Sequence, residues 1–303
     1  MTDYDILVPG NYFCDLIFTG FPRFPALGSE VYTEGLTITV GGALNTVIAL
    51  HRLGVRVGWV GCVGTDLFSR YVLDVVESEG VDTSLLTRVA GPFQRVTVSV
   101  SYPHDRAFIT HVDPAPTPTQ LAFDIQGRVS FKHLHFTGFH LDARTLALFE
   151  RMHQRGITIS MDCQDRPITL ETDNVRAAIA ALQIFMPNAK EARQLASTDE
   201  LDAAAEKLRA LVPTLVIKDG ANGAYAWQGG ARLHAAPIAV KAVDTTGAGD
   251  VFNAGFLAAY LAGKPLADCL TWGSICGGLS TTASGGTAAA PRRADVEAWI
   301  AAR

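Results

Sequence analysis

Seven consecutive residues near the C-terminus combine groups that can bind an anion and accept a proton: Asp244-Thr245-Thr246-Gly247-Ala248-Gly249-Asp250. They lead directly into an apolar segment that begins at Val251 and has the composition of a buried helix. Small residues leave the backbone N–H groups of such a turn accessible, and the positive end of the helix dipole attracts phosphate. A carboxylate in the first turn, here Asp250, can accept the proton of an attacking hydroxyl group. The segment therefore predicts transfer of a phosphoryl group to an alcohol, with Asp250 as the base.

The same seven residues also have an ordinary structural interpretation. Thr245 or Thr246 could be the N-cap of the helix, and an acidic residue in the first turn stabilises helices in general. Both interpretations are open at this point. In the functional one, three backbone amides stabilise the charge of the transferring group, those of Gly247, Ala248 and Gly249.

The composition of the chain restricts its class. Its 303 residues, of which 48% are hydrophobic and 18% charged, can form one large α/β domain with an appendage or two modest domains. The net charge is −5 and no segment carries a Lys/Arg cluster, which argues against nucleic acid as a partner. No apolar run approaches the ~18 residues of a membrane span, and the first five residues lack the basic region of a secretory signal. Five scattered cysteines without a CxxC spacing indicate a reducing compartment, so we expect a cytoplasmic protein.

The elements that must position these residues follow two patterns. From residue 117 onward, strand-like and helix-like segments alternate, which predicts a mostly parallel sheet covered by helices on both faces. The segments at roughly 12–40 and 94–113 instead read as half-exposed strands. We expect them to form a small β-sheet that stands off the core as a lid, within a single domain of residues 1–303. Such a sheet, with one apolar face and free edges, often pairs with a second copy, so a homodimer through the lid is a further hypothesis.

Four separated segments resemble motifs of one known family, the ribokinase (PfkB) family of carbohydrate and nucleoside kinases. They occur in family order over nearly the whole chain: Gly41-Gly42-Ala43-Leu44-Asn45, Gly61-Cys62-Val63-Gly64-Thr65-Asp66, Asn188-Ala189-Lys190-Glu191 and Asp244 to Asp250. One match could arise by chance, whereas four in register are specific. The resemblance implies a ribokinase-like three-layer αβα sandwich with a β-sheet lid. It also implies an ATP-dependent kinase that uses Mg²⁺ and often a monovalent cation such as K⁺.

The resemblance places the acceptor beside the N-terminal motifs. Asp15 could clamp two sugar hydroxyl groups, and Asn45 offers both a donor and an acceptor to a diol. The alternatives are an acid that keeps an edge strand soluble and an Asn near a helix start. Arg166 follows a strand in an element similar to D-x-N-x-R, with a surface ion pair as its alternative. The acceptor-binding candidates are Asp15, Gly41, Gly42, Asn45, Arg106 and Arg166.

A second set of residues is assigned to the nucleotide and its cations by the same resemblance. The nucleotide candidates are Asn188, Lys218, Gly220, Gly223, Thr245, Ser280 and Gly285. Glu191 could hold Mg²⁺ through water, although Asn188 and Glu191 also have the spacing of a capping box. The candidate oxygen ligands for K⁺ are Asp244, Thr246, Ala283 and Gly286.

The expected acceptor class follows from the lack of a basic side chain directly after the glycine pair. Phosphosugar kinases need basic side chains beside the acceptor, but Ala43 and Leu44 follow the glycine pair. We therefore expect transfer of the γ-phosphoryl group of ATP to a primary hydroxyl of an unphosphorylated sugar or sugar acid. A nucleoside is the alternative acceptor, because aromatic residues in the lid could enclose a base. A non-catalytic sensor of nucleotide or sugar on the same fold is the alternative of another class.

Overall fold

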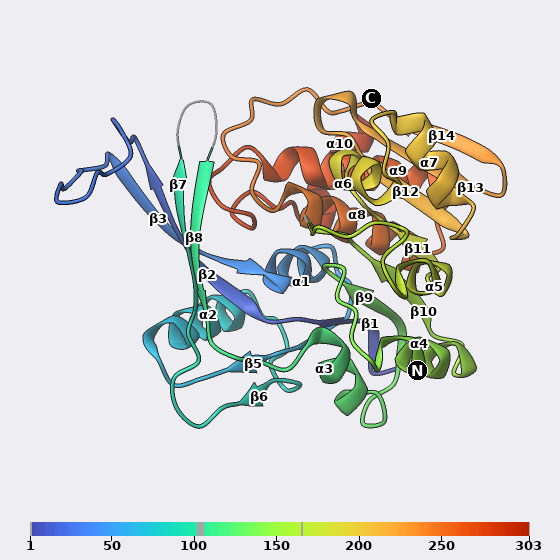
Figure 1. Ribbon diagram of the computed structural model, residues 1–303, viewed down its shortest axis with the longest axis horizontal. Coiled ribbons are helices and arrows are strands. Elements are labelled where there is room, and N and C mark those ends of the chain that lie inside the picture. Colours follow the sequence, from blue (N-terminus) through green and yellow to red (C-terminus); the bar gives the residue numbers. More distant parts are fainter. Residues whose placement is uncertain (1, 102–105, 165, 303) are drawn as a thin grey trace.

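The computed structural model of the protein describes residues 2–101, 106–164 and 166–302. Its centre is an eight-stranded sheet in which six neighbouring strands are parallel and two strands at one edge form an antiparallel hairpin (Figure 1). In spatial order the strands are β14 (Ala231–Ala235), β13 (Ala224–Gln228), β12 (Thr214–Lys218), β11 (Ile184–Phe185), β10 (Thr158–Met161), β9 (Phe131–Phe136), β1 (Tyr4–Pro9) and β4 (Val57–Val60). The central parallel strands are buried on both faces, as their continuous apolar composition requires.

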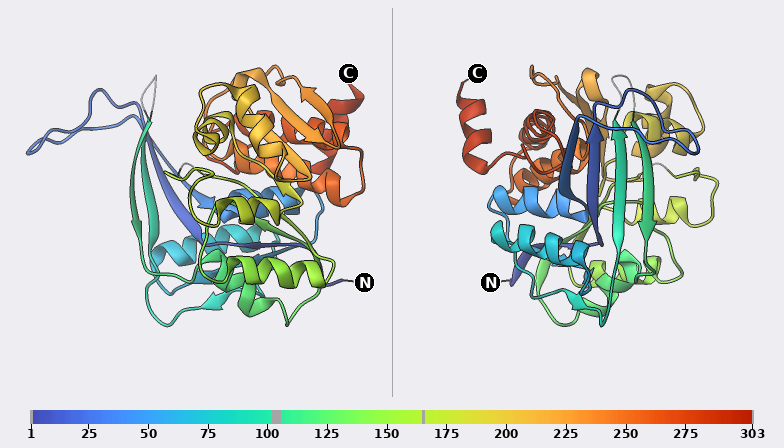
Figure 2. Two further views of the ribbon diagram at one scale, coloured as in Figure 1. Left: turned by 45° about the vertical axis from the view of Figure 1, so that its right-hand side comes forward. Right: turned by 90° about the vertical axis from the view of Figure 1, so that its left-hand side faces the viewer.

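Helices cover both faces of this sheet (Figure 2). One layer contains α1 (Ala43–Arg52), α8 (Ala248–Leu261), α9 (Leu266–Ser280) and α10 (Arg293–Ala301). The other contains α3 (Pro118–Ile125), α4 (Thr145–Gln154), α5 (Val175–Ala180), α6 (Ala189–Ala196) and α7 (Leu201–Arg209). The two layers and the sheet enclose one continuous hydrophobic core. This architecture confirms the predicted α/β sandwich.

A separate four-stranded sheet stands off the core, as predicted (Figures 1 and 2). Its strands, in spatial order, are β3 (Gly35–Gly42), β2 (Tyr12–Thr19), β7 (Arg95–Ser101) and β8 (Arg106–Val112). The long segment 20–34 between β2 and β3 contains no strand, so the boundaries differ from the expected 12–40. β3 also continues through Gly42 and runs directly into α1. Beside this sheet lie α2 (Leu67–Ser78) and a short pair, β5 (Cys62–Val63) and β6 (Thr87–Arg88).

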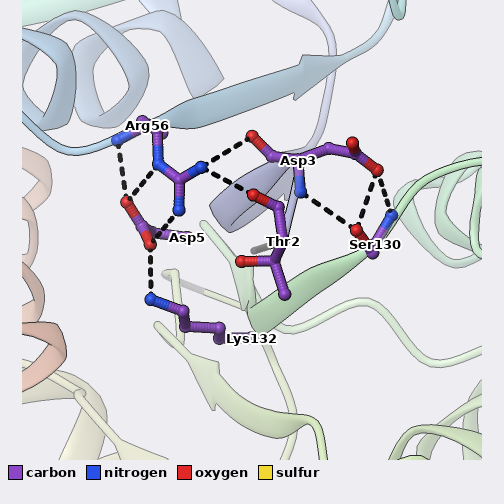
Figure 3. A network of polar contacts seen from close by, with 6 residues as sticks. All are labelled: Thr2, Asp3, Asp5, Arg56, Ser130 and Lys132. Atoms are coloured by element: carbon purple, nitrogen blue, oxygen red, sulfur yellow. Dashed lines mark hydrogen bonds and ion pairs between the residues drawn. The ribbon is translucent and has the colours of Figure 1, made fainter.

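The first strand is fixed by a polar network on its exposed side (Figure 3). The carboxylate of Asp5 accepts hydrogen bonds from Arg56 at 2.9 Å and from Lys132 at 2.8 Å, which joins β1 to its two neighbours. Burial opposes ionisation of Asp5, but the bonds from Arg56 and Lys132 outweigh it and lower the pKa to about 2. The network therefore holds the register of β1, whose carboxyl end leads into the small sheet.

None of the helices in the described ranges is long and apolar enough to cross a membrane.

Candidate active site

The N-terminus of α8 has no side-chain cap among the described residues. Its N-cap is Gly247, whose φ of 70° lies in the left-handed region that favours glycine. The structural alternative, a Thr245 or Thr246 cap, is therefore wrong. The Thr246 hydroxyl instead donates to Asp244 Oδ1 at 2.7 Å.

The backbone amides at this helix end are mostly unpaired. The Ala248 N–H makes a long bond of 3.3 Å to the Thr245 carbonyl, so it is less available than predicted. Within the part of the chain that the structure describes, the neighbouring amides without a partner are those of Gly247, Gly249 and Asp250. The first turn is thus open to an anion, as the sequence indicated.

Asp250 is held beside these amides by α1. The Asn45 side-chain amide donates to Asp250 Oδ2 at 3.0 Å, and Asn45 itself is only 5% exposed. The loss of solvation around the carboxyl group and, after it, the charge of Asp162 raise the pKa of Asp250, which is about 7. The bond from Asn45 and the charge of Lys218 act in the opposite direction. A carboxyl group with a pKa of about 7 suits a base that works near neutral pH.

The segments α1, α8 and the loop after α9 approach one another closely at two glycines, Gly247 and Gly286. A Cβ atom added to Gly247 would lie 2.8 Å from Gly286 Cα, and one added to Gly286 would overlap Asn45 Oδ1. Only glycine fits at these two contacts. Asn45 Oδ1 has no hydrogen-bond partner among the described residues although it is buried, which marks it as an acceptor for a ligand hydroxyl.

A pocket of about 520 Å³ borders Ala248 and Gly249 in the first turn of α8. Its lining is mainly apolar, with Ile238 and Phe252 among the larger side chains. Six of the predicted residues line it: Lys218, Gly220, Gly223, Thr245, Ala248 and Gly249. An apolar cavity that ends at free amides and a lysine has the shape expected for a base and its attached phosphates.

Ser280 does not belong to this pocket. Its side chain is fully buried, and its hydroxyl donates to the Gly277 carbonyl within its own helix at 2.8 Å. The Ser280 hydroxyl thus faces its own helix, as serine in a helix commonly does, whereas its neighbours Gly278 and Thr281 line the pocket.

The small sheet brings Asp15 toward the same region. A Cβ atom added to Gly41 would overlap Asp15 Oδ2, so the carboxylate covers a bare stretch of backbone. Burial raises the pKa of Asp15 to about 6; a hydrogen bond from Thr97 lowers it and the charge of Asp244 raises it. Gly42 has φ of 66°, and a Cβ atom there would lie 2.8 Å from the Asn11 carbonyl. The glycine pair is thus required where β3 turns into α1.

Asp244 organises the segment that precedes α8. One of its oxygens accepts from the N–H and hydroxyl of Thr246, and the other accepts from the Gly285 N–H at 2.9 Å. The four residues predicted as K⁺ ligands therefore lie on two segments that this bond joins. Asp244 and Thr246 are on the first, and Ala283 and Gly286 are on the second. Gly285 supports this arrangement and does not line the nucleotide pocket.

Asn188 and Glu191 form the capping box that was the structural alternative. Asn188 Oδ1 accepts from the Glu191 N–H at 2.9 Å, and Glu191 Oε2 accepts from the Asn188 N–H at 2.8 Å. The pair also lies near the site, because Asn188 bridges to Lys218 and the charge of Glu191 raises the pKa of Asp250. Capping and a role in the site are therefore compatible.

Three further expectations concern the periphery. Arg166 is exposed and its guanidinium donates to His140 at 3.1 Å, beside a separate pocket of about 430 Å³. The side chain of Arg106 lies outside the described residues. Tyr12, one of the aromatic residues expected on the lid, is fully buried, with its ring edge-on to Phe93.

Two residues of the site, Asp162 and Asn253, were not among those predicted from the sequence. Asp162 Oδ2 accepts from Lys218 Nζ at 2.7 Å and from Asn253 Nδ2 at 2.6 Å. Asp162 follows directly after β10, and polar residues at the carboxyl ends of parallel strands gather at one edge of a sheet. That position was the signal in the sequence that could have identified Asp162.

A model of the pfkB family of carbohydrate kinases matches residues 22–293. The chain belongs to this family. An uncharacterized sugar kinase of Archaeoglobus fulgidus is 29% identical over 255 residues, which cover 82% of this chain and 100% of that protein. A fructokinase of Klebsiella pneumoniae is 30% identical, with 85% and 90% covered. A 2-dehydro-3-deoxygluconokinase of Bacillus subtilis is 27% identical, with 90% and 89% covered. This pfkB family protein is thus a carbohydrate kinase.

Solved structures show the same fold. A ribokinase-like protein of E. coli, described as a putative ribokinase II in complex with ATP and Mg²⁺, has a TM-score of 0.83 at 21% identity, with 99% and 100% of the two chains covered. A double-mutant fructokinase of Vibrio cholerae with bound fructose, ADP and potassium ion has a TM-score of 0.78 at 22% identity, with 99% of each chain covered. The predicted ribokinase-like fold is confirmed.

Proposed function

We propose that this carbohydrate kinase transfers the γ-phosphoryl group of ATP to a primary hydroxyl group of an unphosphorylated sugar or sugar acid. The observation that carries the proposal is the Asp250 carboxyl group, which Asn45 holds beside the uncapped N-terminus of α8. With a pKa of about 7, it is ionised in a large fraction of molecules at neutral pH. It therefore combines the basicity and the placement that proton removal from an alcohol requires.

The remaining groups take complementary roles. ATP, as the phosphoryl donor, would occupy the 520 Å³ pocket with its phosphates toward Lys218 and Gly249. The unpaired amides of the first turn would stabilise the charge on the transferring group. Asp15, Asn45 and the backbone of the glycine pair would orient the acceptor so that its hydroxyl group faces Asp250.

The cation sites fit the donors that are present. Glu191 is a buried carboxylate close enough to Asp250 to affect its pKa, and it suits Mg²⁺ held through water. Asp244, Thr246 and the carbonyls of Ala283 and Gly286 are the hard oxygen donors that K⁺ prefers. Mg²⁺ bound with the ATP phosphates would neutralise charge that develops during transfer.

The named relatives support a sugar or sugar acid as the acceptor. Tyr12 is packed in the core and cannot stack on a base, but Phe18 and Phe21 are half-buried and Phe24 is exposed, so the aromatic residues do not decide between the two acceptor classes. The relatives described above include a fructokinase and a 2-dehydro-3-deoxygluconokinase. Arg166, which the resemblance assigns to the acceptor, would pair with the carboxylate of a sugar acid only if that group extends toward the separate 430 Å³ pocket.

A coupled ADP-release assay over neutral sugars, sugar acids and nucleosides tests the proposal, with Asp250→Asn as the matched inactive control. We expect one sugar or sugar acid to stimulate ADP release and the variant to lose that stimulation. A nucleoside as the preferred acceptor would overturn the acceptor class. ADP release that no acceptor stimulates would favour the sensor alternative.

Use of ATP, together with five buried free cysteines, supports a cytoplasmic location.

A further inference from the structure

Three side chains from three elements form a closed network beneath α8. Asp162 Oδ2, at the end of β10, accepts from Lys218 Nζ at 2.7 Å and from Asn253 Nδ2 at 2.6 Å. Asn253 Oδ1 in turn accepts from Lys218 Nζ at 3.2 Å. Asn253 is completely buried and Asp162 is 7% exposed. Burial of an ion pair costs solvation energy that its own attraction seldom exceeds, so stability alone does not account for this network.

The network lies directly against the proposed chemistry. A Cβ atom added to Gly249 would be 3.5 Å from Lys218 Nζ, so the ammonium group rests on the backbone of the first turn of α8. The charged groups that affect Asp250 are Asp162 from β10, Lys218 from β12 and Glu191 from α6. Lys218 is thus the cation shared between the anion-binding turn, Asp162 and the base.

The long side chain of a lysine has no fixed position of its own. Without Asp162, the Lys218 ammonium would lose its carboxylate partner, and Asp250 is an acidic group whose pKa the charge of Lys218 already lowers. An ion pair between them would stabilise the ionised form of Asp250 and weaken it as a base. The two bonds to Asp162 and Asn253 keep the ammonium on the Gly249 side instead.

We propose that Asp162 is a positioning residue for phosphoryl transfer, which holds the Lys218 ammonium under the anion-binding turn and keeps it away from Asp250. The inference rests on the proposed function, because it assumes that Asp250 is the base. Asn253 completes the network by donating to Asp162 and accepting from Lys218.

Asp162→Asn removes one negative charge near Asp250 and releases Lys218. Both changes favour the ionised form of Asp250, so its titration midpoint should fall by on the order of one pH unit. The acid limb of the pH profile of kcat/KM should move to lower pH by the same amount, while the plateau rate falls ~10-fold or more. Lys218→Gln removes the cation and should move the midpoint upward. Opposite shifts in the two variants cannot result from a general loss of stability.

A reciprocal exchange provides the decisive comparison. In the double variant Asp162→Asn/Asn253→Asp, an amide still donates to a carboxylate, both side chains can still accept from Lys218, and the net charge is unchanged. We expect the midpoint and the rate to return toward wild-type values. Asp74→Asn, which removes an exposed charge on α2, is the control for a change in net charge and should leave both unchanged.

The midpoint is measured directly by ¹³C NMR of labelled aspartate carboxyl groups in the protein without substrates, with Asp250→Asn used to assign the resonance. An unmoved midpoint in both single variants, or a double variant no better than Asp162→Asn, would overturn the inference. If Asp162→Asn does not fold, Lys218→Gln and the double variant decide. Full activity of Asp250→Asn would instead refute the proposed base, which distinguishes the two failures.

Discussion

Replacing Asp250 with Asn should make the protein more stable while it removes most of the activity. The carboxyl group of Asp250 has a pKa of about 7 in the folded protein, compared with 3.8 for a solvated aspartate. The folded state therefore binds the proton more tightly than the unfolded state. Between these two values, the free energy of unfolding of the wild type must decrease as the pH rises. Asn is neutral at every pH, so the variant avoids this loss.

The size of the effect follows from the two pKa values. Each unit of pKa difference corresponds to about 1.4 kcal/mol, so the stability advantage of Asp250→Asn approaches about 4 kcal/mol above pH 8. At pH 5 the advantage falls to about 2 kcal/mol, because the folded wild type is then largely protonated. The side chain introduced by Asp250→Asn can still accept the hydrogen bond from Asn45, so the packing is retained. We expect turnover to decrease by ~10²–10⁴, the usual range for a positioned base.

Urea denaturation of both proteins at pH 5, 6.5 and 8 measures the difference in the free energy of unfolding. The advantage of the variant should grow by about 2 to 3 kcal/mol from the lowest to the highest pH. A constant advantage, or a variant less stable than the wild type at pH 8, would show that Asp250 is not a carboxyl group with a raised pKa. Retained turnover would separately contradict its role as the base.

Three further predictions concern the surroundings of this residue. Gly247→Ala and Gly229→Ala both place alanine at positive φ, which should cost about 1 kcal/mol of stability at each position. Gly247→Ala should cost more than Gly229→Ala and should abolish turnover, because its Cβ meets the Gly286 backbone whereas position 229 has open space. Equal stability and activity of the two variants would contradict the close packing. Asp15→Asn should raise the acceptor KM by ~10–100-fold at pH 8. In the wild type, that KM should rise as the pH falls below 6, where Asp15 becomes protonated, and a KM independent of pH would exclude Asp15 from acceptor binding. The homodimer hypothesis predicts a mass of twice 32.4 kDa by light scattering, and an acidic substitution at exposed Ile109, on the face of the small sheet opposite Asp15, should halve it.

Local features of the site could be predicted from the sequence because they depend on neighbouring residues. The turn before α8 needs small residues at fixed positions, and the glycine pair at residues 41 and 42 marks where a strand turns into a helix. Four such motifs in order were sufficient to indicate the family and its fold. The orientation of Ser280 could not be predicted, since its hydroxyl group bonds to its own helix and does not line the pocket.

The Asp162 network could not be predicted in the same way. Lys218 is 56 residues from Asp162 and 35 from Asn253, and Asp162 and Asn253 are 91 residues apart. The three side chains meet only because β10, β12 and α8 pack together. No local pattern links an aspartate after one strand to a lysine at the end of another. The raised pKa of Asp250 was likewise beyond local reasoning, because its causes are burial and charges contributed by distant elements.

Burial, reinforced by neighbouring negative charges, explains why the two key carboxyl groups of the site have raised pKa values. Asp244 raises the pKa of Asp15, whereas Asp162 and Glu191 raise that of Asp250. The cation with the largest effect on Asp250 is Lys218, and Asp162 already pairs with it. The region is therefore rich in negative charge before a polyanionic nucleotide arrives. Cations bound beside Glu191 and Asp244 would compensate this excess and lower the pKa values of both carboxyl groups. The ionised form of the base would then be more populated with those cations bound than without them.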